Sequence, residues 1–148
     1  MAVGDLIVFE EFPVQLGKEI HNLATDTIKL GIINNTLDPT AADATPTWTD
    51  YSANEVSAGG GYTAGGISLT SVTWTETDGV STLDADNVSL VQNAAGFTNG
   101  YWGVIFNDTA TNKDALAFVD LGGPASEQAG PININWGAAG ILKYTVSN

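Results

Sequence analysis

The sequence predicts an all-β protein, and three observations lead to that prediction. Apolar and polar residues alternate in several short runs, as in Ile28, Leu30 and Ile32, which is the period of a half-buried strand. Turn-forming Gly, Asn and Asp residues recur about every ten residues between these runs, a spacing typical of β-sandwiches. Only 14% of residues are charged, so polarity comes largely from Thr, which favours strands. We expect an antiparallel, jelly-roll-like β-sandwich.

The 148 residues are expected to form a single domain, in which residues 1–26 are an irregular N-terminal arm and residues 27–148 are the sandwich. The run DLIVFEEF at residues 5–12 begins as a strand, and Pro13 ends it because proline cannot donate to a sheet. Residues 14–24 fit either one face of a helix, which Gly17 would weaken, or an extended arm. The alternating run at residues 27–33 is the first clear strand.

The segment from residue 34 to residue 66 is predicted to be a long, glycine-rich loop. It ends in three consecutive glycines at 59–61 and two more at 65–66. A loop of this length in a small domain is usually functional or mobile. Trp48 and Tyr62 lie within it, which indicates that part of the loop packs against the domain.

The remaining sequence predicts a series of strands joined by turns. Residues 67–76 are expected to form one strand with a bulge at 70–71, and Asp78-Gly79 is a strong signal for a tight hairpin turn. The other expected strands are 80–83, 88–91, 101–106, 115–121, 132–136 and 142–146. Residues 101–106, apolar on both faces, are expected at the centre. The predicted core contains Trp102, Val104, Ile105, Phe106, Leu116, Phe118, Ile134, Trp136 and Leu142.

No catalytic, cofactor-binding or metal-binding residue is predicted, and we do not expect an enzyme. There is no cysteine, and His21 is the single histidine. Residues 61–68 resemble a phosphate-binding loop, but Ile67 stands where that loop needs its lysine. Residues 84–87 resemble the start of a calcium loop, but Ser89 and Ala95 occupy the positions of the required Gly and Glu. A surface calcium site there is left open.

The charge is strongly unbalanced, with 17 carboxylates, four lysines, no arginine and a formal net charge of −13. Such a surface repels phosphate backbones, so a nucleic-acid partner is not expected. No apolar run is long enough to span a membrane, and the N-terminus lacks the pattern of a signal peptide. If the chain binds an assembly, we expect the attachment face to be depleted of carboxylates, with these concentrated in loops 38–50, 84–86 and 108–114.

Several segments together resemble a known group of proteins. The segments are 48–69, 83–88, the strand ending at 107–109, 116–121 and 140–142. Their order resembles small virion proteins encoded in the head-gene region of tailed bacteriophages, over residues 27–142. The resemblance implies a structural role in decorating or cementing a capsid. The implied partners are the major capsid protein or other virion proteins. The resemblance also implies a homo-oligomer on the particle, for which a trimer is one option. The implied location is the capsid surface, after synthesis in the host cytoplasm.

Four apolar side chains in the irregular segments, Phe9, Phe12, Trp48 and Tyr62, are expected to contact a partner, because loops carry contacts more often than regular strands do. Two other functions fit the sequence. The chain could be a neck, tail or head-fibre component of the same virion. It could also be a carbohydrate-binding module that stacks sugars on Trp48 and the tyrosines.

Overall fold

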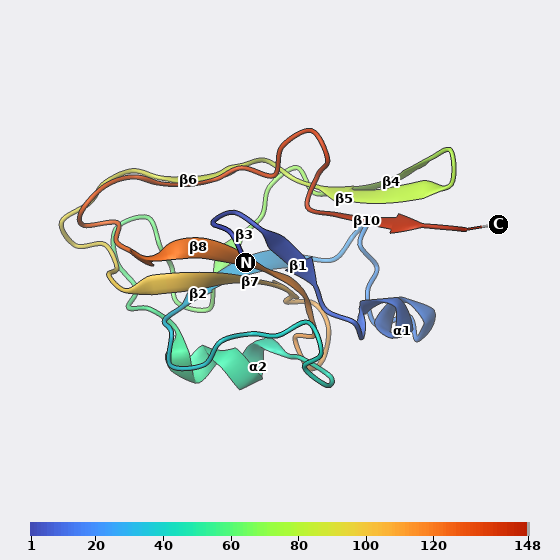
Figure 1. Cartoon of the computed structure of the whole chain (residues 1–148), viewed down its shortest axis with the longest axis horizontal. Helices are drawn as coiled ribbons and strands as arrows, with labels where there is room; N and C mark the ends of the chain where they lie inside the picture. The colour runs from blue at the N-terminus through green and yellow to red at the C-terminus, as the bar shows by residue number, and fades with distance from the viewer. Residues whose placement is uncertain (148) are drawn as a thin grey trace.

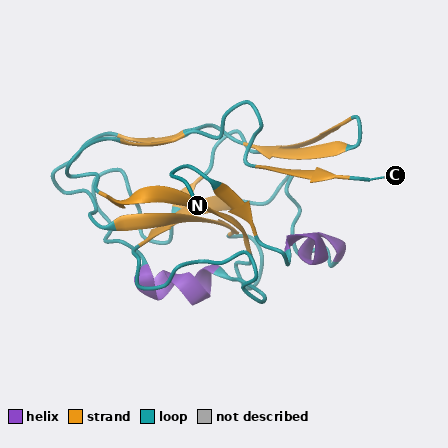
Figure 2. Cartoon of the chain, in the orientation of Figure 1, coloured by secondary structure: helices purple, strands orange, loops and turns teal. Residues whose placement is uncertain are grey.

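The structure is a computed structural model that describes residues 1–147, and it is mostly β. Strands account for 37% of the chain and helices for 9%, and every paired strand is antiparallel. The expectation of a mostly β, antiparallel protein is therefore confirmed (Figures 1 and 2). The elements in chain order are β1 (Leu6–Val8), α1 (Phe12–Gly17), β2 (Ile28–Ile33), α2 (Trp48–Tyr51), a 3-10 turn (Ser52–Asn54), β3 (Ile67–Ser68), β4 (Thr73–Thr77), β5 (Val80–Asp84), β6 (Val88–Leu90), β7 (Gly100–Asn107), β8 (Ala115–Ala125), β9 (Ile132–Ile134) and β10 (Leu142–Thr145).

A five-stranded sheet in the order β1-β8-β7-β2-β3 is the central element of the fold. Strand β7 lies in its middle, as the apolar run at 101–106 predicts. Val104, Ile105 and Phe106 are consecutive and all fully buried. Successive residues of a strand point to opposite faces, so both faces of this sheet must be covered.

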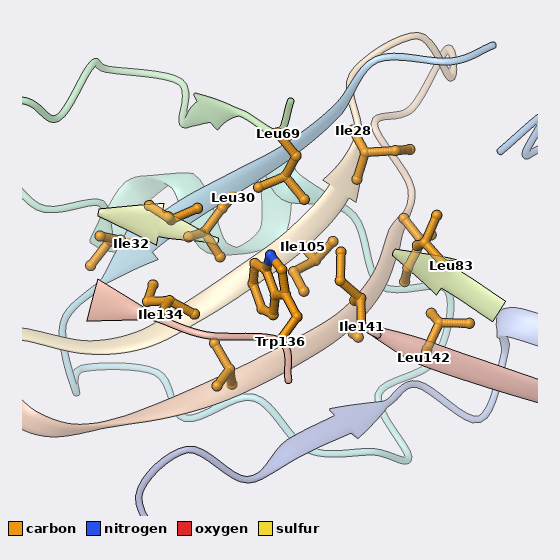
Figure 3. Close-up of a cluster of buried hydrophobic side chains, with 14 of the residues drawn as sticks. Ile28, Leu30, Ile32, Leu69, Leu83, Ile105, Ile134, Trp136, Ile141 and Leu142 are labelled. Atoms are coloured by element: carbon orange, nitrogen blue, oxygen red, sulfur yellow. The ribbon is translucent and has the colours of Figure 1, made fainter. Parts of the chain in front are cut away.

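The first face is covered by two smaller sheets, β10-β5-β4 and β6-β9. The chain passes from β5 to β6 and from β9 to β10 through short irregular segments, and both sheets lie above the central sheet in Figure 1. Ile28, Leu30 and Ile32 of β2 point toward this layer and meet Ile134 and Trp136 in one buried cluster (Figure 3). The indole of Trp136 is fixed because its Nε1–H donates to the Asp86 carbonyl at 2.9 Å.

The second face is covered by the long segment between β2 and β3. The Trp48 ring stacks on Phe106 with a centroid separation of 4.8 Å and an interplanar angle of 4°. It lies directly over Gly31, where any side chain would collide with the indole. The segment is also tied by backbone bonds, from Trp48 N to Lys113 O at 2.8 Å and from Val56 N to Ile32 O at 3.0 Å. Residues 34–56 are therefore an integral part of the fold.

The expectation of an irregular N-terminal arm is wrong. Residues Leu6–Val8 pair with β8 as an edge strand, and Phe12 begins a short helix with Pro13 in its first turn, a position where proline is well tolerated. The Phe9 ring packs on Phe118 with their centroids 5.1 Å apart. The first 17 residues supply part of the core.

The single strand expected at residues 67–76 is also wrong, because this stretch contributes to two different sheets. Ile67–Ser68 pair with β2, whereas Thr73–Thr77 pair with β5. Ser71 between them has a φ of 54°, which turns the chain out of the first sheet. The hydroxyls of Thr70 and Ser71 donate to Asp86 at 2.8 and 2.6 Å, so the break is held in place and is not a bulge within one strand.

The substitution Gly31→Ala tests the packing of Trp48 on the central sheet. Its methyl group would displace the indole, and we expect a loss of about 1–3 kcal/mol in the free energy of unfolding, measured by urea denaturation. Gly17→Ala is the matched control, since nothing lies near that position, and it should leave stability unchanged or raise it by up to about 1 kcal/mol. Equal effects of the two substitutions would contradict the close packing.

Candidate functional site

Three separate stretches of this acidic chain are almost free of charge. Residues 56–75, 87–107 and 121–142 contain no Asp, Glu, Lys, Arg or His except Glu127, although the formal net charge is −13. A random surface of this protein would carry many carboxylates. The distribution therefore raises the question of where these stretches lie relative to one another.

Parts of all three stretches meet at one end of the molecule. The loops at 57–61, 91–99 and 126–131 are joined by hydrogen bonds, and we call them together the tip. The Gln128 side-chain amide donates to the Gly96 carbonyl at 2.8 Å, and that of Gln92 donates to the Gln128 carbonyl at 3.0 Å. Figure 1 shows the loops between β6 and β7 and between β8 and β9 together at the left end.

Glu127 lies at the centre of the tip and connects its three loops. Its Oε1 accepts from the Gly61 backbone N–H at 2.6 Å, its own N–H donates to the Phe97 carbonyl at 3.0 Å, and its carbonyl accepts from Asn93 N–H at 3.0 Å. The side chain is fully buried. Gly60 and Gly96 lie so close to the carboxylate that a side chain at either position would collide with it. The glycines here serve close packing around one carboxylate.

The exposed part of the tip consists of uncharged side chains, several of which are small. Val91 is 81% exposed, and the other exposed apolar residues are Ala58, Ala94, Ala95 and Ala129. Small side chains lose little rotamer freedom when they are immobilised. The sequence analysis did not identify these residues as a site. The signal that could have found them is the absence of charge from three stretches of an acidic chain.

The charged cluster around Asp108 lies away from the tip. Strand β7 runs from the tip at Gly100 to Asn107 over eight residues, a length of about 26 Å. Just beyond its far end, Asp108 binds Lys29 Nζ at 2.8 Å and Lys113 Nζ at 2.9 Å. The hydrogen bond from Lys29 is the main cause that holds the pKa of Asp108 below its usual value. Two of the four lysines thus form ion pairs with Asp108 within the chain.

Tyr62 holds the rest of the glycine-rich loop against the central sheet. Its hydroxyl accepts from Ile32 N–H at 2.9 Å and donates to Glu55 Oε1 at 2.7 Å. The same Glu55 oxygen accepts from Gly65 N–H at 2.8 Å. Burial raises the pKa of the Tyr62 phenol, so the hydroxyl stays protonated. The side chain thereby satisfies a backbone donor of β2 next to the short strand β3.

The four residues expected to contact a partner are all inside the chain's own core. Phe9, Phe12, Trp48 and Tyr62 are between 1% and 4% exposed. The premise that they stand free in irregular segments is wrong, because those segments fold over the central sheet. Trp48 also cannot stack on a sugar while it is stacked on Phe106, so this residue does not support a carbohydrate-binding module.

His21 belongs to a buried polar cluster at the far end of β7. The Asn107 Oδ1 atom accepts from the N–H groups of Thr109 and Ala110, so its Nδ2 atom faces His21 Nδ1 at 3.2 Å. His21 Nδ1 must therefore accept a hydrogen bond from the Asn107 amide, and His21 Nε2–H donates to Gln15 Oε1 at 2.9 Å. The arrangement therefore requires the neutral Nε2–H tautomer, and it connects α1 to the central sheet.

Residues 1–147 contain no group of three or more His, Asp or Glu side chains placed to hold a metal ion. No helix within these residues is long and apolar enough to cross a membrane. Asp86, in the stretch that resembles a calcium loop, accepts hydrogen bonds from Thr70 and Ser71.

Comparisons of the chain with protein-family models, with curated proteins and with solved structures found no match.

The His21 cluster predicts a specific dependence of stability on pH. Burial lowers the pKa of His21 below 6.5, and the opposing effects of Asp114 and Asp26 do not cancel it. The unfolded chain then takes up the proton first. Stability should be fully present above pH 6.5 and should fall as the pH decreases toward the folded-state pKa. Urea midpoints between about pH 7.5 and 5.5 measure this fall.

His21→Gln is the control, since glutamine is neutral throughout that range and can still donate and accept hydrogen bonds. Its urea midpoint should change less with pH than that of the unaltered chain. The same slope in both proteins would show that His21 is not the group responsible.

Proposed function

We propose that this chain is a non-enzymatic structural protein of a bacteriophage virion, which decorates and stabilises the capsid and attaches through the tip. The observation that carries the proposal is the uncharged tip on a protein of net charge −13. Burying an unpaired charge in an interface is expensive, so a face that must contact another protein gains from having none. The resemblance of residues 27–142 to small virion proteins of tailed phages supports the same function.

The tip has the properties needed for repeated contacts in a lattice. Its exposed side chains are uncharged, and its three loops are held together by Glu127. A preorganised surface loses less entropy on binding than a flexible one. Each contact needs only modest affinity when neighbouring copies reinforce one another. The partner in this proposal is the major capsid protein or another virion protein.

The finer architecture is part of the proposal. In this proposal the central sheet is one layer of a jelly-roll-like β-sandwich, and the sheets β10-β5-β4 and β6-β9 form the other layer. The buried cluster around Ile134 and Trp136 lies between them, and the tip loops lie at one end. Loops gathered at one end of such a scaffold are a common place for binding residues, since the sheets keep them in position. In this arrangement the carboxylates beyond the far end of β7 would face solvent and keep decorated particles apart.

Counting copies on purified virions of the phage or prophage that encodes the chain tests the function. Quantitative mass spectrometry should find on the order of hundreds of copies per particle if the chain coats the capsid. About a dozen copies or fewer would instead show a neck, tail or head-fibre component. Absence of the chain from purified virions would refute a virion role.

The substitution Val91→Asp tests the tip as the attachment surface. It places a carboxylate at the most exposed apolar position of the tip, and we expect at least about tenfold weaker binding to particles that lack the protein. Val146→Asp is the matched control, since Val146 is also an exposed valine, at 57%. It lies outside the tip, where its N–H donates to the carbonyl of Gly79 in the turn between β4 and β5.

Wild-type binding should change little between low and near-molar salt, because screening acts mainly on exposed charges. Binding that weakens many-fold with salt, or equal losses in the two Val→Asp variants, would rule out attachment through an uncharged tip.

A further inference from the structure

A cavity of about 300 Å³ opens between the two layers, next to the tip. It lies between β1, which pairs only with β8, and β9, which pairs only with β6. In Figure 1 the β6–β9 ribbon runs above β8 and β1 without joining them. We call this cavity the slot. Its volume is at the lower limit of roughly 300 Å³ for ligand pockets.

The slot meets β9 along its free edge. Every residue from Pro131 to Trp136 lines it. Successive side chains of a strand point to opposite faces, so a cavity bordered by all of them contacts the edge of the strand and not one face. Unpaired N–H and C=O groups along such an edge can pair with another chain.

The buried side chains of the slot are apolar, and polar groups line the rest of it. Val119 of β8, Ile134 of β9 and Trp136 form its buried part, and Leu121 is half-buried at its mouth. Asp120 is the single Asp, Glu, Lys, Arg or His residue among the lining residues. The slot therefore offers a strand edge for backbone hydrogen bonds and an apolar floor for side chains, whereas the Asp120 carboxylate points to the opposite face of β8 from Val119.

The chain's own N-terminus does not occupy the slot as a strand. Gly4 has a φ of 86°, and the turn is closed by Ala2 N–H donating to Asp5 Oδ2 at 2.7 Å and Asp5 N–H donating to the Ala2 carbonyl at 2.9 Å. Val3 is 73% exposed. The turn bends the first residues out of an extended conformation, although Val3 and Gly4 still line the slot.

We infer that the slot binds an extended segment of a partner protein, which adds a strand to the free edge of β9. Alternate apolar side chains of the segment enter the slot, as in other cases of strand addition. The segment is free of acidic residues, because the net charge of −13 would repel them. A second copy of this chain fits poorly, because it would bring another net charge of −13 toward the same acidic surface.

A synthetic peptide tests this inference on the free protein. The probe is a heptapeptide of alternating Val and Thr with a Lys at each end, and the control peptide has Glu at each end. The Lys-ended peptide should change the tryptophan fluorescence saturably, since Trp136 borders the slot. It should also protect the amides of Ile132–Ile134 from hydrogen exchange. The Glu-ended peptide should bind at least about tenfold more weakly.

Leu121→Asn removes an apolar wall of the slot and should weaken binding by roughly tenfold. The matched change Val146→Asn, at an exposed position outside the slot lining, should leave binding within about twofold. Leu121 also packs against the core, so Leu121→Asn affects more than the slot. Amide hydrogen exchange on the unaltered protein with the peptide is therefore the deciding measurement. No saturable signal, or protection confined to other strand edges, would overturn the inference. The slot would bind such a strand whether or not the chain coats a particle. A negative peptide assay would therefore refute only the slot inference, and a negative copy count on virions would refute only the proposed function.

Discussion

The rest of the structure depends on the need to cover both faces of the central sheet. Strands β2, β7 and β8 are apolar on both sides, and Ile33, Val104 and Phe118 face the opposite way from Leu30, Ile105 and Val119. One face is covered by the two small sheets. The other is covered by the segment between β2 and β3 together with Phe9, which follows β1. Gly31 makes this possible by leaving space for the Trp48 ring.

This constraint explains the absence of charged residues from the buried strands but not from the loops of the tip. A strand buried on both faces cannot carry charged side chains without a large cost in desolvation, and the stretch 87–107 that contains β7 has none. The loops that continue such strands at the tip carry no charged residue except the buried Glu127, whereas the turn at the other end of β7 contains Asp108, Lys113 and Asp114. Burial of the strands does not require uncharged loops. Their composition is therefore the feature that calls for a functional reason.

The strands of the second half could be predicted well from the sequence because their signals are local. The Asp78-Gly79 turn has positive φ at both residues, as a tight hairpin requires, and the apolar run at 101–106 is central in the sheet. The position of Trp48 could not be predicted, since it depends on Gly31 and Phe106, which are distant in sequence. The tip was missed for the same reason. Its three stretches are recognisable in the sequence, but only the fold brings them around Glu127.

The central claim is that one end of the molecule is built for contact and the rest for solvent. Hydrogen exchange of the chain bound to its particle, compared with the free chain, tests it most directly. The account predicts new protection in residues 57–61, 91–99 and 126–131, with the turn at 108–114 and the hairpin at 76–79 unchanged. Protection of the turn and the hairpin, with the tip still exchanging freely, would contradict it.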